Sequence, residues 1–209
     1  MRLVLSHPRY NVNMFDIQRV FYYAVSVGYG EGVRVMLGDR RADVNSLDHD
    51  GRPAALLAVL RGHADVLHLL LADPRINVDA LAPDDNSLIL AAVRPEHVDL
   101  LRDLLADPRV RVDVRGCIEQ SVLFEAVGRG VHNMVRILLQ NERIQINPVD
   151  EMGKTPLLKA IENVNEEMAK LLLENERVDV FHMGDVGPTV MDCATQTKHE
   201  SIIRLLAQR

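Results

Sequence analysis

Eight histidines and two cysteines are the side chains of this sequence best suited to bind a metal. His63, His97 and His199 are separated by whole multiples of one interval, so they share one position of a periodic pattern. No HxxxH pair and no CxxC motif accompanies them, although a zinc site needs clustered ligands. We therefore predict no metal and no cofactor. We interpret the three histidines as turn residues that hydrogen-bond between helices.

Nucleophilic catalysis also lacks a candidate in this sequence. A reactive thiol needs a neighbouring base and an electropositive setting, and the sequence places neither beside Cys117 or Cys193. The glycines of GYGEG, residues 28 to 32, lie at the same phase of the pattern as Gly62. An inter-helix turn explains them better than a phosphate-binding loop does. The sequence therefore predicts no catalytic residues and a protein that is not an enzyme.

The composition indicates the cellular compartment and the class of partner that we expect. The 209 residues carry a net charge of -6, which argues against general binding to nucleic acid backbones. Two cysteines in no paired motif indicate a reducing compartment, and we expect a cytoplasmic protein. The first residues lack the features of a signal peptide, and no apolar run is long enough to span a membrane.

The elements that position these side chains follow from an internal repeat. LLLADPRINVD, residues 69 to 79, recurs as DLLADPRVRVD, residues 103 to 113. Three further columns keep the same spacing: Arg41, Arg75, Arg109, Arg143 and Arg177; Pro53, Ser87, Ser121, Thr155 and Thr189; and Ala24, Ala58, Ala92, Ala126, Ala160 and Ala194. Columns in phase over most of a chain are the signature of a repeat architecture.

Each repeat is predicted to contain two short helices and a projecting hairpin. Apolar residues recur at helical spacing in 53–61, a second helix opens at Asp65, and Pro74 ends it. Residues 76–81 then alternate apolar and polar, as a short extended segment does. Helices of nine or ten residues are marginal alone, because helix nucleation is costly below about 12 to 15 residues. The repeats must therefore stack on one another to be stable.

The pattern resembles the ankyrin repeat family. GKTPLLKA, residues 153 to 160, is similar to the family's G-x-T-P-L-H-x-A, and the dipeptide at 62–63 and the leucines at 69–71 match its G-H and leucine run. The resemblance implies an all-α repeat solenoid of stacked helix-turn-helix units joined by short β-hairpins. It implies one array over 1–209, with a partial cap over 1–15 and six repeats of about 34 residues starting near 16, 48, 82, 116, 150 and 184.

By the same resemblance, the chain is a non-catalytic protein–protein interaction module of the scaffold or adaptor type, with a concave binding surface. Alternatives are a ligand-binding or nucleic-acid-binding ankyrin array, or the recognition domain of a larger enzyme. We expect a monomer that binds a protein partner and no membrane.

The family places its contact residues on the hairpin tips and on the exposed face of the first helix. The candidates at these places are Leu57, Leu60, Arg61, Arg94, Arg129, Ile118 and Met152. We expect the three arginines to stand in line on successive repeats and to pair with carboxylates of an acidic partner segment. The alternative is that the arginines form a solvated face and the apolar residues pack locally.

A modification site also follows from the resemblance. LGDRRADVN, residues 37 to 45, is similar to the spacing at which ankyrin repeats are hydroxylated on asparagine, which makes Asn45 the acceptor. The alternative interpretation is that Asn45 only hydrogen-bonds the hairpin backbone, as asparagine does in turns.

Overall fold

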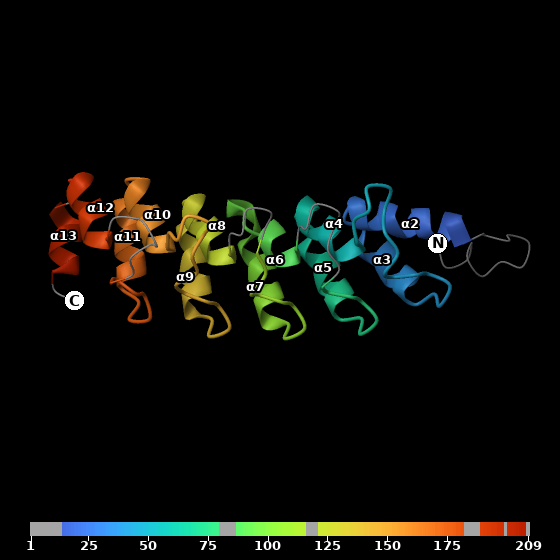
Figure 1. The fold of residues 1–209 in the computed structure, drawn as a ribbon. Helices are drawn as coiled ribbons and strands as arrows, with labels where there is room; N and C mark the ends of the chain where they lie inside the picture. Colours follow the sequence, from blue (N-terminus) through green and yellow to red (C-terminus); the bar gives the residue numbers. More distant parts are fainter. Residues whose placement is uncertain (1–13, 80–86, 116–120, 182–188, 199, 208–209) are drawn as a thin grey trace, which may run out of the picture. The chain divides into compact units, whose positions relative to one another are not determined.

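The computed structural model describes residues 14–79, 87–115, 121–181, 189–198 and 200–207. Nearly all of its regular structure is helical (Figure 1). The helices are α2 (Met14–Ser26), α3 (Gly30–Leu37), α4 (Ala54–Arg61), α5 (Ala64–Leu71), α6 (Leu88–Ala91), the short 3-10 helix η1 (Pro95–His97), α7 (Val98–Ala106), α8 (Val122–Gly128), α9 (His132–Gln140), α10 (Pro156–Glu162), α11 (Glu166–Leu173), α12 (Val190–Gln196) and α13 (Glu200–Leu206).

The column of small polar residues marks where the first helix of a repeat begins. The hydroxyl oxygens of Ser87, Ser121, Thr155 and Thr189 each accept a hydrogen bond from the backbone N–H three residues later. Such caps satisfy one of the N–H groups that a helix leaves without a partner at its start. Thr189 completes a reciprocal capping box with Asp192. The predicted starts of these short helices are thus confirmed.

The chain divides into two compact units. Unit 1 comprises residues 1–92 and 99–110, and unit 2 comprises 93–98 and 111–209. Within unit 1, the first helices stack in the order α2, α4 and α6, and α3 packs against α5 to form a second layer. Within two of these repeats the first helix also packs against the second, α2 against α3 and α4 against α5.

Unit 2 is built in the same way. Its first helices stack in the order α8, α10 and α12, and its second helices stack in the order α9, α11 and α13. The all-α repeat architecture is confirmed. The number of repeats and the single array over 1–209 stay predictions.

The division between the units falls in the repeat whose first helix is shortest. Helix α6 has 4 residues, whereas α4 has 8 and α8 has 7. Pro95 disfavours a helical conformation of the residue before it, and Arg94 is extended at φ -139° and ψ 142°. In the two neighbouring repeats, the position after the one equivalent to Pro95 is a glycine. Both of these glycines, Gly62 and Gly130, adopt the positive φ of an inter-helix turn.

The hairpin segments contribute to the core by alternation. Ile76 and Val78 are buried, whereas Asn77 and Asp79 are exposed. This is the alternation of buried and exposed side chains that an extended segment predicts. The β pairing is limited to single bridges in the part of the chain that the structure describes. One joins Leu47 to Pro53, and another joins residues 115 and 121. Among the described residues, no helix is both long and apolar enough to cross a membrane.

Candidate functional site

A groove of about 970 Å³ lies within unit 1, between α2, the hairpin that follows α3, and α4. It is the best candidate for a binding site because charged and apolar side chains converge there. Its lining consists of Asp16, Gln18, Arg19, Val20, Tyr22, Tyr23, Ser26, Leu47, Asp48, His49, Arg52, Leu57 and Arg61.

Exposed apolar side chains gather in this groove. Tyr23 is 69% exposed, Leu47 is 53% exposed and Val20 is 37% exposed. Leu57 lies in the same lining but is buried. Single exposed apolar residues are ordinary on a protein surface, but several around one hollow mark an interaction site.

The cationic side chains of the groove differ in how they are paired. Arg52 donates to the Asp48 carboxylate through Nε at 3.0 Å and also contacts Asp50, so its charge is neutralised locally. Arg19 and Arg61 are exposed and have no ion pair or side-chain hydrogen bond with any described residue. Two guanidinium groups are therefore available to a ligand.

The walls of the groove are fastened to each other. The Tyr22 hydroxyl donates to the Ser46 carbonyl oxygen, and Gln18 Nε2 donates to the Asp43 carbonyl oxygen at 2.7 Å. Burial raises the pKa of Tyr22 to about 12, so this hydroxyl keeps its proton and remains a donor. Helix α2 is thus fixed to the base of the hairpin before any ligand binds, which lowers the entropic cost of binding.

The structure places two of the predicted contact residues in the groove. Arg61 lies at the end of α4 and is exposed, as expected. The expectation that Leu57 is exposed is wrong, because this residue of α4 is only 3% exposed. Leu60 is half-buried and does not line the groove.

The other predicted contact residues belong to unit 2. The placement of Arg94 on the first helix is wrong, since α6 ends at Ala91 and Pro95 prevents its extension. Arg129 Nε pairs with Glu125 at 2.6 Å, and Met152 is 70% exposed. The line through Arg61, Arg94 and Arg129 stays a prediction, and Ile118 lies outside the described residues.

Sequence reasoning missed most of the groove lining, including Arg19, Tyr23 and Leu47. Tyr23 occupies the same repeat position as Leu57, one repeat earlier in the sequence, so this equivalence could have identified it. Leu47 pairs with Pro53 across the base of the hairpin, and its apolar side chain next to polar tip residues was the available signal. For Arg19 the repeat offers no guide, because Pro53 occupies the equivalent position.

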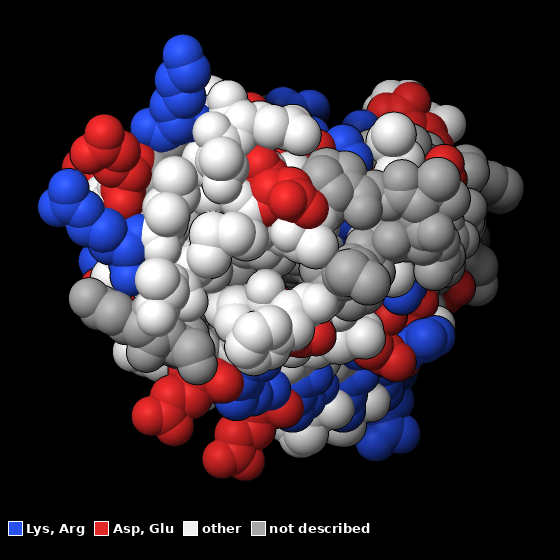
Figure 2. Space-filling model, turned by 60° about the vertical axis from the view of Figure 1, so that its left-hand side comes forward, with Lys and Arg blue, Asp and Glu red and all other residues white. Residues whose placement is uncertain are grey.

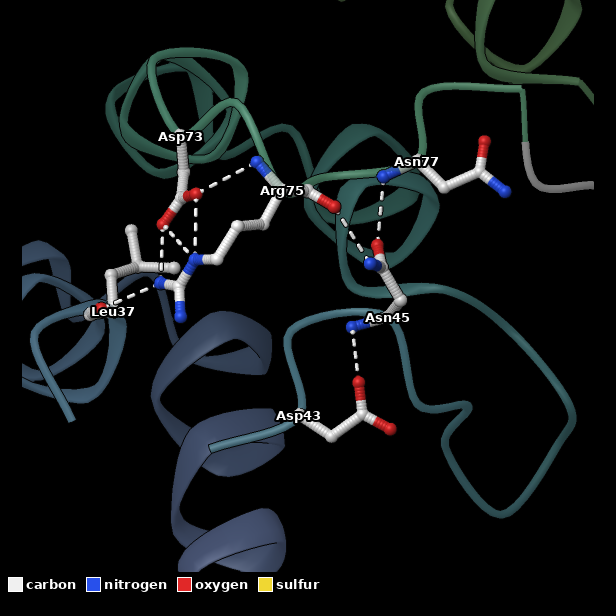
Figure 3. Close-up of polar contacts among 6 residues, drawn as sticks. All are labelled: Leu37, Asp43, Asn45, Asp73, Arg75 and Asn77. Atoms are coloured by element: carbon white, nitrogen blue, oxygen red, sulfur yellow. Dashed lines mark hydrogen bonds and ion pairs between the residues drawn. The ribbon is translucent and has the colours of Figure 1, made fainter. Parts of the chain in front are cut away.

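Asn45 connects two successive repeats of unit 1 (Figure 3). Its Nδ2 donates to the Arg75 carbonyl oxygen, and its Oδ1 accepts from the Asn77 N–H, both at 2.7 Å. Asn147 makes the same pair of bonds in unit 2, to the Arg177 carbonyl oxygen and the Asp179 N–H, both at 2.8 Å. A structural role that bonds hairpin backbone accounts for Asn45 fully. Its hydroxylation stays a prediction.

Several other reactive side chains are held by structural contacts, although the buried His97 leaves Nδ1 without a hydrogen-bond partner among the described residues. His63 Nε2 lies 3.0 Å from the Ser26 carbonyl oxygen, which confirms that it bonds between helices. Burial raises the pKa of the Cys193 thiol, so the sulfur is less reactive than an exposed thiol. Asp48, His49 and Asp50 offer ligand atoms within 4.8 Å of one another, but Arg52 already supplies the cation to both carboxylates.

A second surface with few charges is visible at the end of unit 2. Figure 2 shows mostly uncharged side chains over the face turned forward, with one acidic group among them and further charged residues around the edge. Met191 of α12 is 39% exposed, and Phe181, in the hairpin segment before it, is 79% exposed.

Comparison with known proteins identifies the repeat. A family model described as ankyrin repeats, in three copies, matches residues 21–115 and 88–183. No curated protein matches the chain.

Solved structures have the same fold at low sequence identity. An ankyrin repeat domain from Acinetobacter baumannii is 21% identical with a TM-score of 0.80, covering 90% of this chain and 96% of that one. The ankyrin repeat domain of Bcl-3, of the IkappaB protein family, is 21% identical with a TM-score of 0.79, covering 90% and 85%. A chain from the complex of a Bdellovibrio bacteriovorus predatory endopeptidase with an immunity protein is 16% identical with a TM-score of 0.68, covering 92% and 98%.

Proposed function

Since this chain belongs to the ankyrin repeat family, we propose that it is a non-catalytic protein-interaction module of the scaffold or adaptor type. We further propose that its partner binds in the groove of unit 1. A fold does not determine a function, so the proposal rests on the site. The observation that carries it is that exposed Tyr23 and Leu47 line the same groove as two arginines that have no ion pair among the described residues.

The composition of the groove favours a protein partner over a small polar substrate. Interface cores are enriched in aromatic residues and arginine, and Tyr22, Tyr23, Arg19 and Arg61 all line this groove. One solved relative of the fold comes from a complex between an endopeptidase and an immunity protein, which is in keeping with a protein-binding role.

The test compares affinity capture by the full chain and by two variants. Leu47→Glu places a charge in the groove, and we expect it to lose the partners that the parent chain captures. Phe181→Glu is the control, because Phe181 is also an exposed apolar residue of a hairpin segment but belongs to unit 2. A partner that binds the parent and both variants equally would contradict the groove proposal.

The extent of the surface is tested by a further variant. If the arginine line continues the surface into unit 2, then Arg94→Glu combined with Arg129→Glu weakens capture of the same partner. The equal charge change at Arg102 and Arg136, both exposed, should leave capture unchanged. Equal capture by both double variants would confine the binding surface to unit 1.

A further inference from the structure

We propose that the occupant of the unit 1 groove is an extended acidic peptide segment, in which an apolar side chain is flanked by carboxylates. This inference rests on the proposed function and names the chemistry of the partner. The groove volume of about 970 Å³ lies near the upper end of the roughly 300–1,000 Å³ of sites for drug-sized ligands. A short segment of chain suits such a volume better than the broad surface of a folded domain.

We assign carboxylates to the peptide because the charged side chains that line the groove are not all paired with each other. Asp48 accepts from the backbone N–H of Asp50 at 2.9 Å, from that of Arg52 at 2.8 Å and from Arg52 Nε at 3.0 Å. Its charge is therefore satisfied by the hairpin itself. Arg19, on α2, and Arg61, at the end of α4, have no such partner among the described residues. The lining also holds Asp16 on α2, so its formal charges are those of two carboxylates and three guanidinium groups, and the excess is positive.

The two uncompensated arginines lie on different walls of the groove. Arg19 and Tyr23 come from α2, Arg61 comes from the end of α4, and Leu47 comes from the hairpin that follows α3. A guanidinium group binds a carboxylate through two parallel N–H donors. An apolar residue contacting Tyr23 and Leu47, with acidic residues on either side of it, therefore matches all four side chains.

The net charge of -6 does not prevent this binding. Exposed charges farther apart than about 8 Å are largely screened at physiological ionic strength. The pairing within the groove is short-range, and it occurs beside apolar side chains that exclude water. Charge complementarity in such a site acts mainly on specificity.

The experiment is a selection of short random peptides by display on the full chain, run in parallel on three variants. The first variant, Arg19→Glu with Arg61→Glu, reverses the two uncompensated charges. The second, Leu47→Glu, blocks the apolar part of the groove. The third, Arg102→Glu with Arg136→Glu, is the control, because it changes the net charge equally at exposed positions outside the groove.

We expect the parent chain and the control to select the same peptides, with an apolar residue between acidic ones. The charge-reversed chain should select peptides in which basic residues take the acidic positions. A synthetic peptide of the selected sequence should bind the charge-reversed chain at least tenfold more weakly than the parent, equal to about 1.4 kcal/mol at 25 °C.

Two other outcomes separate this inference from the proposed function. If the selected peptides lose binding to Leu47→Glu but carry no acidic residues, the acidic occupant is wrong and the groove remains the binding site. If the selected peptides bind Leu47→Glu as well as the parent, or if no peptide is selected, both the occupant and the peptide-binding groove are wrong.

Discussion

The junctions between the second helix and the hairpin are made differently in the two units. In unit 1 the junction begins with an aspartate, as at Asp73, and an arginine two residues later forms a two-point ion pair with it. Arg75 then donates to the carbonyl oxygen of Leu37, the last residue of α3, at 2.6 Å. In unit 2 an asparagine replaces the aspartate, and Asn175 Nδ2 itself donates to the Leu139 carbonyl oxygen at 3.2 Å.

The difference shows what the junction requires. Leu37 and Leu139 occupy equivalent positions at the ends of second helices, where carbonyl groups lack a partner within the helix. In both units a side chain from the next repeat supplies the missing donor. An aspartate has no donor, so it orients an arginine that has. An asparagine donates directly, and Arg177 then reaches the Ile144 carbonyl oxygen at 3.0 Å instead.

The units therefore differ in electrostatics while sharing their geometry. Both aspartate and asparagine accept the N–H two residues later, at 3.0 Å for Arg75 and 2.9 Å for Arg177. Only the aspartate junction adds an ion pair, which lowers the pKa of Asp73 and raises that of Arg75. Four predictions test this comparison, and the expected effect decreases from one to the next.

The cores should be equally sensitive to truncation if the units differ only at their junctions. Leu105 of unit 1 and Leu139 of unit 2 are equivalent by the repeat and are 8% and 7% exposed. We expect Leu105→Ala and Leu139→Ala each to lower the free energy of unfolding by about 2–5 kcal/mol. Urea denaturation measures both. A loss below about 1 kcal/mol in one of them would contradict equal packing of the two cores.

The asparagine junction should be converted to the aspartate type by one substitution. Asn175→Ala removes the donor to Leu139 and the acceptor for the Arg177 N–H, which should cost about 1–2 kcal/mol. Asn175→Asp keeps the acceptor and offers Arg177 the ion pair found in unit 1, so it should cost less than half as much at pH 7. Equal losses for the two variants, measured by urea denaturation, would show that the arginine cannot exchange partners.

The bridging asparagines should contribute equally, because their geometry is the same in both units. Asn45→Ala and Asn147→Ala each remove two hydrogen bonds to the next repeat and should each cost about 0.5–1.5 kcal/mol. Asp113→Ala, at the same repeat position, is the control, and this exposed residue should change stability by less than about 0.5 kcal/mol. Thermal unfolding of the three variants decides whether the bridge matters.

Much of the fold could be predicted from the sequence, because residues with the same structural role recur at a fixed interval in stacked repeats. The capping column of Ser87, Ser121 and Thr155 locates the helix starts by its period alone. The effect of Pro95 on α6 was not predicted, although the proline is plain in the sequence. Arg94 was placed on the first helix because the repeat pattern puts the equivalent residues there. A local backbone rule outweighs the family pattern there.

The candidate site was less accessible to sequence reasoning. The burial of Leu57 on α4 agrees with the alternative that the apolar candidates pack locally, and the residue type alone could not decide between that alternative and an exposed contact. The fact that Arg52 is neutralised while Arg61 is not depends on the hairpin turn that carries Asp48. The substitution of asparagine for aspartate at the junctions is plain in the sequence, but which donor reaches Leu139 depends on the geometry of the junction.

The smallest expected effect is a difference in acid sensitivity between the two types of junction. The hydrogen bonds and ion pairs with Arg41 and Arg75 lower the pKa of Asp39 and Asp73 below their ordinary value of 3.8. A carboxyl group whose folded pKa is lowered stabilises the fold above its unfolded pKa, and this contribution is lost as the pH falls through the folded value. The contribution of each exposed pair is small, because solvent screens the arginine.

We therefore expect hydrogen exchange to show the junctions at Asp39 and Asp73 losing protection as the pH falls below about 4, earlier than those at Asn141 and Asn175. The exchange free energies should be compared after correction for the intrinsic dependence of exchange on pH. Asp73→Asn should remove this acid response at its own junction, because an amide does not titrate. If the two types of junction lose protection together in the parent chain, the ion pairs contribute nothing measurable. The two units would then differ in the identity of the donor and not in electrostatic stability.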